Sequence, residues 1–174
     1  YLLHLSAIEQ GRIKEDPAQL WKSAEDFWNK EKEAFLSGNI SHAQLYAQAG
    51  FEQAKLAVLS ALKSELKTED KVEYLLNYAE ALEERGRKQE ADEQREKAIA
   101  LIKKEVGLLS DQINWCLSGT LPDCKLAKVR QSRENYQKAR EIIENSWERI
   151  KKLAELANSI SPGKVFMPSL EAVS

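Results

Sequence analysis

The chain has 174 residues, in which 26 Lys and Arg nearly balance 28 Asp and Glu, and its net charge is −2. This length suits one domain or a short run of helical repeats, and the near-neutral charge provides no overall field that would attract nucleic acid or an anionic membrane. Ala, Leu, Glu, Lys, Gln and Arg dominate over 7 Gly and 4 Pro, which is typical of long helices. We therefore predict an all-α protein whose partners are proteins or peptides, with no nucleic acid.

Start and stop signals divide the chain into helices. Asp16 followed by Pro17 begins one helix and Gly38 ends it, and Ser41 with Gln44 forms a capping box for the next. We predict a single helical domain over residues 1–162 with helices at about 17–37, 42–67, 69–85, 88–117 and 123–160, followed by a non-helical tail over 163–174. Thr68 to Asp70 is expected to cap the third of these helices. No apolar run approaches the roughly 18 residues of a membrane span.

Two of these helices have distinct faces. The helix over 42–67 carries a stripe of small residues at three-and-four spacing, which admits a neighbouring helix closely: Ala43, Ala47, Gly50, Ala54, Ala57 and Ala61. The last helix carries a heptad seam of Tyr136, Ala139, Ile143, Ser146, Ile150, Leu153 and Ala157. Such a seam predicts supercoiled packing on a partner helix, either within the chain or in a second copy. Antiparallel long-helix hairpins, as repeats or as a bundle, are the expected architecture.

Residues 75–101 resemble a tetratricopeptide repeat. Leu75, Tyr78, Ala79, Leu82, Gly86, Ala91 and Ala98 stand at the spacing of that family, with small residues where two helices of a hairpin touch and Gly86 at the turn. An earlier hairpin over residues 20–54 repeats the pattern less closely, and its turn at Gly38 lies farther from Gly86 than the family's repeat of about 34 residues. The resemblance implies protein or peptide binding in a concave groove.

Cys116 and Cys124, the only cysteines, flank the turn between the last two long helices. Their position predicts a disulfide that ties two helix ends together, and with it a periplasmic or extracellular location; two free thiols in a cytoplasmic chain are the alternative. The first residue is Tyr1 rather than Met, so we expect either a piece of a longer chain or a processed chain. A signal peptide, a lipid anchor as in a lipoprotein, or a membrane helix could have preceded it.

Sequence patterns for catalysis are absent. The two histidines, His4 and His42, lie far from both cysteines in the sequence, and the chain contains no Glu-x-x-His pair. We therefore predict no metal site, no cofactor and no catalytic residues. Acidic residues at Glu80, Glu83, Glu84 and Glu90 alternate with Arg85, Arg87 and Lys88. Mixed signs at these steps are typical of a solvated helix face.

Aromatic side chains are the candidates for partner binding. Our candidate groove residues are Trp21, Trp28, Tyr46, Phe51, Tyr74 and Tyr78, because aromatic residues supply much of the affinity at protein interfaces; a structural role in the core is the alternative. We favour a non-enzymatic scaffold or protein-binding module of the bacterial cell envelope. The alternatives are a small-ligand or sensor domain with an apolar pocket between helices, and an oligomeric structural subunit that associates through the last helix.

Overall fold

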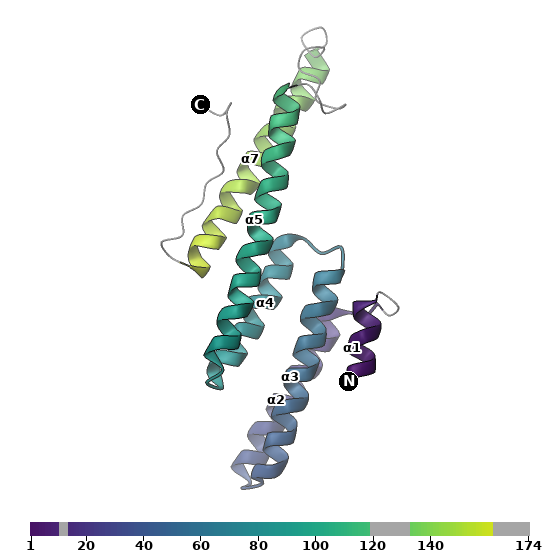
Figure 1. Ribbon diagram of the computed structural model, residues 1–174, viewed down its shortest axis with the longest axis vertical. Coiled ribbons are helices and arrows are strands. Elements are labelled where there is room, and N and C mark those ends of the chain that lie inside the picture. The colour runs from purple at the N-terminus through teal and green to yellow at the C-terminus, as the bar shows by residue number, and fades with distance from the viewer. Residues whose placement is uncertain (11–13, 119–132, 162–174) are drawn as a thin grey trace. The chain divides into compact units, whose positions relative to one another are not determined.

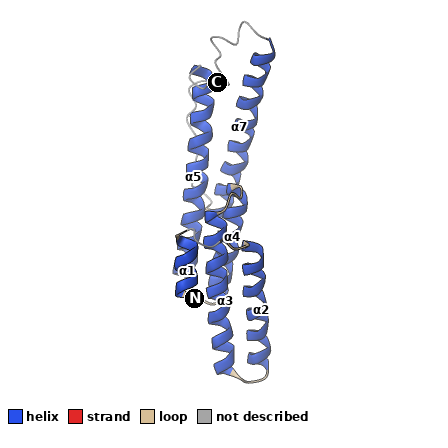
Figure 2. Ribbon diagram, turned by 90° about the vertical axis from the view of Figure 1, so that its right-hand side faces the viewer, coloured by secondary structure: helices blue, strands red, loops and turns tan. Residues whose placement is uncertain are grey.

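A computed structural model describes residues 1–10, 14–118 and 133–161 of the chain, and all regular structure in these ranges is α-helical. The prediction of an all-α protein built from helical hairpins is confirmed (Figure 2). Contacts divide the chain into two compact units, residues 1–95 and residues 96–174. The division falls inside a continuous helix.

The first unit consists of four helices and the start of a fifth. These are α1 (Leu2–Glu9), α2 (Pro17–Leu36), α3 (Ile40–Lys63), α4 (Thr68–Glu84) and the first turns of α5 (Lys88–Ser118). Helices α2 and α3 pack extensively on each other, and α1 and α4 each pack on α3. The turn of the α2–α3 hairpin lies beyond the ends of α1 and α4, so these two helices cover only part of the hairpin (Figures 1 and 2).

The ends of the helices follow from their capping residues. Asp16 Oδ1 accepts a hydrogen bond from Ala18 N at 3.0 Å, and Pro17 occupies the first helical position of α2, as predicted. Gly38 and Gly86 adopt φ of 80° and 76°, the left-handed conformation that glycine allows at the end of a helix. Both predicted hairpin turns are therefore confirmed.

Two predicted caps are wrong. Helix α3 begins earlier than expected because Asn39, not Ser41, accepts the hydrogen bond from His42 N, at 3.3 Å. Helix α4 begins at Thr68 itself, behind Lys67, which makes no side-chain cap. Helix α3 also ends at Lys63 instead of Lys67. The sequence signals located each helix. They did not identify the capping residue, because several nearby Ser, Thr and Asn side chains can accept hydrogen bonds from the first backbone amides, and the conformation of the turn selects among them.

The second unit pairs the remainder of α5 with α7 (Arg133–Ile160). The seam residues Ala139, Ser146, Ile150, Leu153 and Ala157 are buried in the single chain. Arg149 of α7 pairs with Glu105 of α5 at 2.7 Å across the two helices. Of the two partners that the heptad spacing allowed, a helix of the same chain occupies the seam. The predicted start of this helix at residue 123 and the tail over 163–174 lie outside the described residues.

The small-residue stripe of α3 is buried as expected. Ala54, Ala57 and Ala61 have no exposed surface, and Gly50 lies directly against the indole of Trp28 in α2. A Cβ on Gly50 would lie 2.5 Å from Cδ1 and 2.9 Å from Cε2 of that ring. The stripe therefore brings α2 and α3 close enough for a tryptophan to rest on the backbone of the facing helix.

Candidate functional site

A groove runs between α2 and α4 on the surface of the first unit. It contains two adjoining cavities that share Trp21 of α2 and Asn77 of α4. The larger has a volume of about 450 Å³ and extends toward Trp28 and Arg85, and the smaller, of about 330 Å³, extends toward Tyr74. We call the two cavities together the α2–α4 groove. Because the two cavities share Trp21 and Asn77, one extended segment of chain could place a side chain in each of them.

A row of aromatic rings underlies the groove. Trp21 stands edge-on to Tyr74, with centroids 6.4 Å apart, and edge-on to Trp28 at 5.8 Å. Trp28 in turn meets Phe51 of α3 at 5.5 Å, and Phe51 meets Tyr78 of α4 at 6.4 Å. Edge-to-face pairs of this kind stabilise the packing of neighbouring helices. The row therefore joins α2, α3 and α4 and holds the walls of the groove in place.

The six aromatic candidates fall into three positions. Trp21 and Tyr74 are half-buried and line the groove, and Trp28 also lines it although only 9% of its surface is exposed. Phe51 and Tyr78 are buried core residues below. Tyr46 lies elsewhere, stacked on Phe27 with centroids 6.5 Å apart. The structure thus brings three of the predicted residues together in the groove.

Arg85 lies over two rings in the middle of the aromatic row. Its guanidinium carbon lies 4.9 Å from the ring centre of Trp28 and 5.2 Å from that of Phe51. Its Nη2 donates to Glu31 Oε1 at 2.5 Å, with both side chains about one-fifth exposed. The prediction that this charged stretch is a solvated face is wrong for Arg85, because the cation–π contacts hold its side chain over the core.

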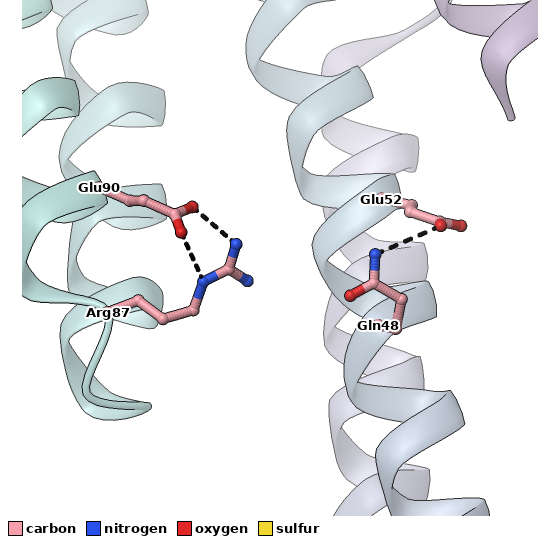
Figure 3. A network of polar contacts seen from close by, with 4 residues as sticks. All are labelled: Gln48, Glu52, Arg87 and Glu90. Carbon is pink, nitrogen blue, oxygen red and sulfur yellow. Dashed lines mark hydrogen bonds and ion pairs between the residues drawn. The ribbon is translucent and has the colours of Figure 1, made fainter.

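A second guanidinium, that of Arg87, also lies over the ring of Phe51. Its guanidinium carbon is 4.7 Å from the ring centre of Phe51. Its Nε and Nη2 donate to the two carboxylate oxygens of Glu90 at 3.0 and 2.6 Å (Figure 3). Figure 3 also shows a separate hydrogen bond on α3, from Gln48 to Glu52. Because the carboxylate of Glu90 neutralises Arg87, the guanidinium of Arg87 can pack over the core residue Phe51 without leaving an unpaired charge.

Carboxylates dominate the charged lining of the groove. Glu25, Glu80 and Glu84 surround the larger cavity, and Asp70 and Glu73 the smaller one. Within the described part of the chain, none of these five side chains forms an ion pair. Burial, reinforced by Asp16, Glu73 and Asp70, raises the pKa of Tyr74 above its usual value of 10.0. The groove is therefore a region of negative potential.

Fewer cationic side chains than carboxylates line the groove. Lys32 and Arg85 also line the larger cavity, but Arg85 is already neutralised by Glu31. Sequence reasoning missed the groove role of Glu25, Lys32, Asn29 and Asn77, because α2 and α4 are separated by α3 in the chain and only the folded hairpins bring them together. The sequence predicted that Glu80 and Glu84 are exposed to solvent, and they are. It did not predict that both line the larger cavity of the groove.

The histidines have local partners. His4 Nε2 lies 2.8 Å from Glu15 Oε1, and His42 Nδ1 lies 2.9 Å from Asn39 Nδ2 at the start of α3. In the ranges that the structure describes, no three His, Cys, Asp or Glu side chains are placed to hold a metal ion together. None of the helices described combines the length and the hydropathy needed to cross a membrane.

No family model, curated protein or solved structure matches this chain. The geometry of the groove is therefore the basis for assigning a function. Of the residues that carry the tetratricopeptide resemblance, Leu75, Ala79, Leu82 and Ala91 are buried, and Gly86 lies at the turn between α4 and α5.

Proposed function

We propose that this protein is a non-enzymatic interaction module that binds a segment of a partner protein in the α2–α4 groove. The observation that carries the proposal is the pair of adjoining cavities on either side of Trp21, lined by aromatic rings and by two free amides, Asn29 and Asn77. Neither amide hydrogen-bonds to a described side chain or backbone group. Such amides can pair with the backbone of an extended peptide.

The lining of the α2–α4 groove suits a peptide better than an apolar small ligand; the more apolar cavity, of about 580 Å³, lies elsewhere on the α2–α3 hairpin, at Phe35, Leu36 and Ile40. A sensor pocket between helices would be mostly apolar, whereas the cavities beside Trp21 and Trp28 are lined by several carboxylates and amides. Association through the last helix is also less favoured, because Ile150 and Leu153 of the seam are fully buried within the single chain.

The proposal is tested with a displayed library of random dodecapeptides selected on the immobilised chain. Recovered peptides are expected to lose at least about 30-fold in affinity for the Trp21→Ala variant, the effect of a binding hot spot of about 2 kcal/mol. Tyr46→Ala is the matched control, since Tyr46 lies outside the groove. Equal affinity for both variants, with circular dichroism showing both folded, would place binding elsewhere and refute the proposal.

We further propose that Cys116 and Cys124 form a disulfide and that the protein works in the bacterial cell envelope, in line with processing as a lipoprotein. Cys116 is fully buried near the end of α5, with its Sγ 3.8 Å from Ala139 O of α7, while Cys124 lies outside the described residues. Thiol titration of the protein in denaturant should detect no thiol before reduction and two after it. Two thiols that react without reduction would contradict both the disulfide and the exported location that rests on it.

A further inference from the structure

We infer that the segment bound by the α2–α4 groove is basic, with a Lys or Arg side chain seated in the smaller cavity between Trp21 and Tyr74. This inference rests on the proposed function and specifies its ligand. Three separate features of the groove lead to it: its uncompensated charge, the arrangement of two aromatic rings, and the position of an amide between the cavities.

The first feature is charge. Five carboxylates line the groove without an ion-pair partner among the described residues, whereas of the two lining cations only Lys32 is not already neutralised. All five are exposed, so each interaction with a bound cation contributes little by itself. Their combined field along one groove still favours a ligand of opposite sign and repels an acidic one.

The second feature is the corner formed by Trp21 and Tyr74. Their planes meet at 79° with centroids 6.4 Å apart, and both rings are half-buried on the wall of the smaller cavity. No described cation lies over either ring. This edge-to-face pair lies beside the carboxylates of Asp70 and Glu73 on the wall of the smaller cavity, an environment that attracts an ammonium or guanidinium group.

The corner differs in this respect from the middle of the aromatic row. There the ring of Trp28 already has the guanidinium of Arg85 over it, at 4.9 Å. Among the described residues, a cation therefore lies over the ring of Trp28, whereas none lies over the ring of Trp21. A volume of about 330 Å³ accommodates one long side chain of this type.

The third feature is the position of Asn77, which belongs to both cavities. A segment that places one side chain in each cavity must carry its backbone past this amide, which can donate to a carbonyl and accept from an N–H. A second basic side chain in the larger cavity would face Glu25, Glu80 and Glu84. The ligand that fits is therefore an extended segment with two basic residues at close spacing.

The test uses three fluorescein-labelled dodecapeptides of alternating residues, Lys with Ser, Gln with Ser, and Glu with Ser, measured by fluorescence anisotropy. The Lys peptide is expected to bind at least tenfold more tightly than the Gln peptide and to weaken as salt rises, and the Glu peptide to bind most weakly. Replacing both Asp70→Asn and Glu73→Gln should weaken the Lys peptide at least fivefold.

The matched control carries Glu33→Gln and Glu96→Gln, which change the net charge equally but remove exposed carboxylates that do not line the groove. It should keep the affinity of the unmodified chain within twofold. Equal weakening by the two double variants would show attraction to the whole surface and overturn the inference. If selected peptides require Trp21 but prefer Gln or Glu, the inference fails while the proposed function stands. If no peptide binds in a Trp21-dependent way, both fail.

Discussion

Replacing Gly50 with alanine tests how closely α2 and α3 approach each other. The new Cβ would lie 2.5 Å from Cδ1 and 2.9 Å from Cε2 of Trp28, and closer still to Nε1. Carbon atoms in favourable contact are about 3.5–4.0 Å apart, so the indole would have to retreat by roughly 1 Å. It has little room, because it is packed between the rings of Trp21 and Phe51 and under Arg85.

The magnitude follows from two opposing effects. Overpacking a core costs about 1–3 kcal/mol, and we expect the upper half of that range because rings surround Trp28 on two sides. Alanine in place of glycine inside a helix contributes about 1 kcal/mol in the opposite direction. The free energy of unfolding should therefore fall by about 1–2 kcal/mol, measured by urea denaturation with circular dichroism and tryptophan fluorescence.

Gly107→Ala is the matched control for this experiment. Gly107 lies inside α5 and is exposed, and a Cβ at this position would have no heavy atom of another residue within 4 Å beyond its own helix backbone. Its replacement should therefore stabilise the protein by about 0.5–1 kcal/mol. In a Trp28→Phe background, Gly50→Ala should lose most of its cost, because the smaller ring leaves space. If Gly50→Ala stabilises the unmodified chain as much as Gly107→Ala does, the close approach is refuted.

Three further predictions concern packing, capping and titration. Ile150→Ala should reduce the free energy of unfolding by about 2–5 kcal/mol, and Ile143→Ala by less, because Ile150 is fully buried and Ile143 only partly; similar losses in urea denaturation would contradict the packing of α7. Asn39→Ala should cost about 1 kcal/mol and Ser41→Ala under about 0.5 kcal/mol, and the reverse order would show that Ser41 is the cap after all. Burial raises the pKa of Tyr78 above its usual value of 10.0. The folded chain therefore holds the phenol proton more tightly than the unfolded chain does. The stability that this provides is present below about pH 10 and is lost as the pH rises above it. The Tyr78→Phe variant should lose less of its free energy of unfolding between about pH 9 and 11, as measured by urea titration. An unchanged loss would argue against a buried phenol.

The helices could be predicted from the sequence because their determinants are local. Asp16 before Pro17, and glycines at positions 38 and 86, act on the backbone within a few residues, and the structure confirms both turns. The same holds for the faces of the helices: the spacing of Ala54, Ala57 and Ala61 predicted a buried stripe, and these residues are fully buried.

The groove could not be predicted in the same way. Trp21 and Asn77 belong to different hairpins, and periodicity shows that each lies on a helix face without showing which faces meet. Aromatic character alone did not separate Trp21, in the groove, from Phe51, below it, or from Tyr46, elsewhere on the unit. That separation depends on how α4 packs against α3, which is a contact between residues distant in the chain.

Charge shows the same division. The sequence established that acidic and basic residues alternate through the end of α4 and the start of α5, and that such residues prefer solvent. Only the tertiary structure decided that Arg85 lies over two aromatic rings while Glu80 faces the groove. Helix formation and burial pattern are consequences of short-range backbone and side-chain preferences, whereas the environment of a charge depends on every helix packed around it.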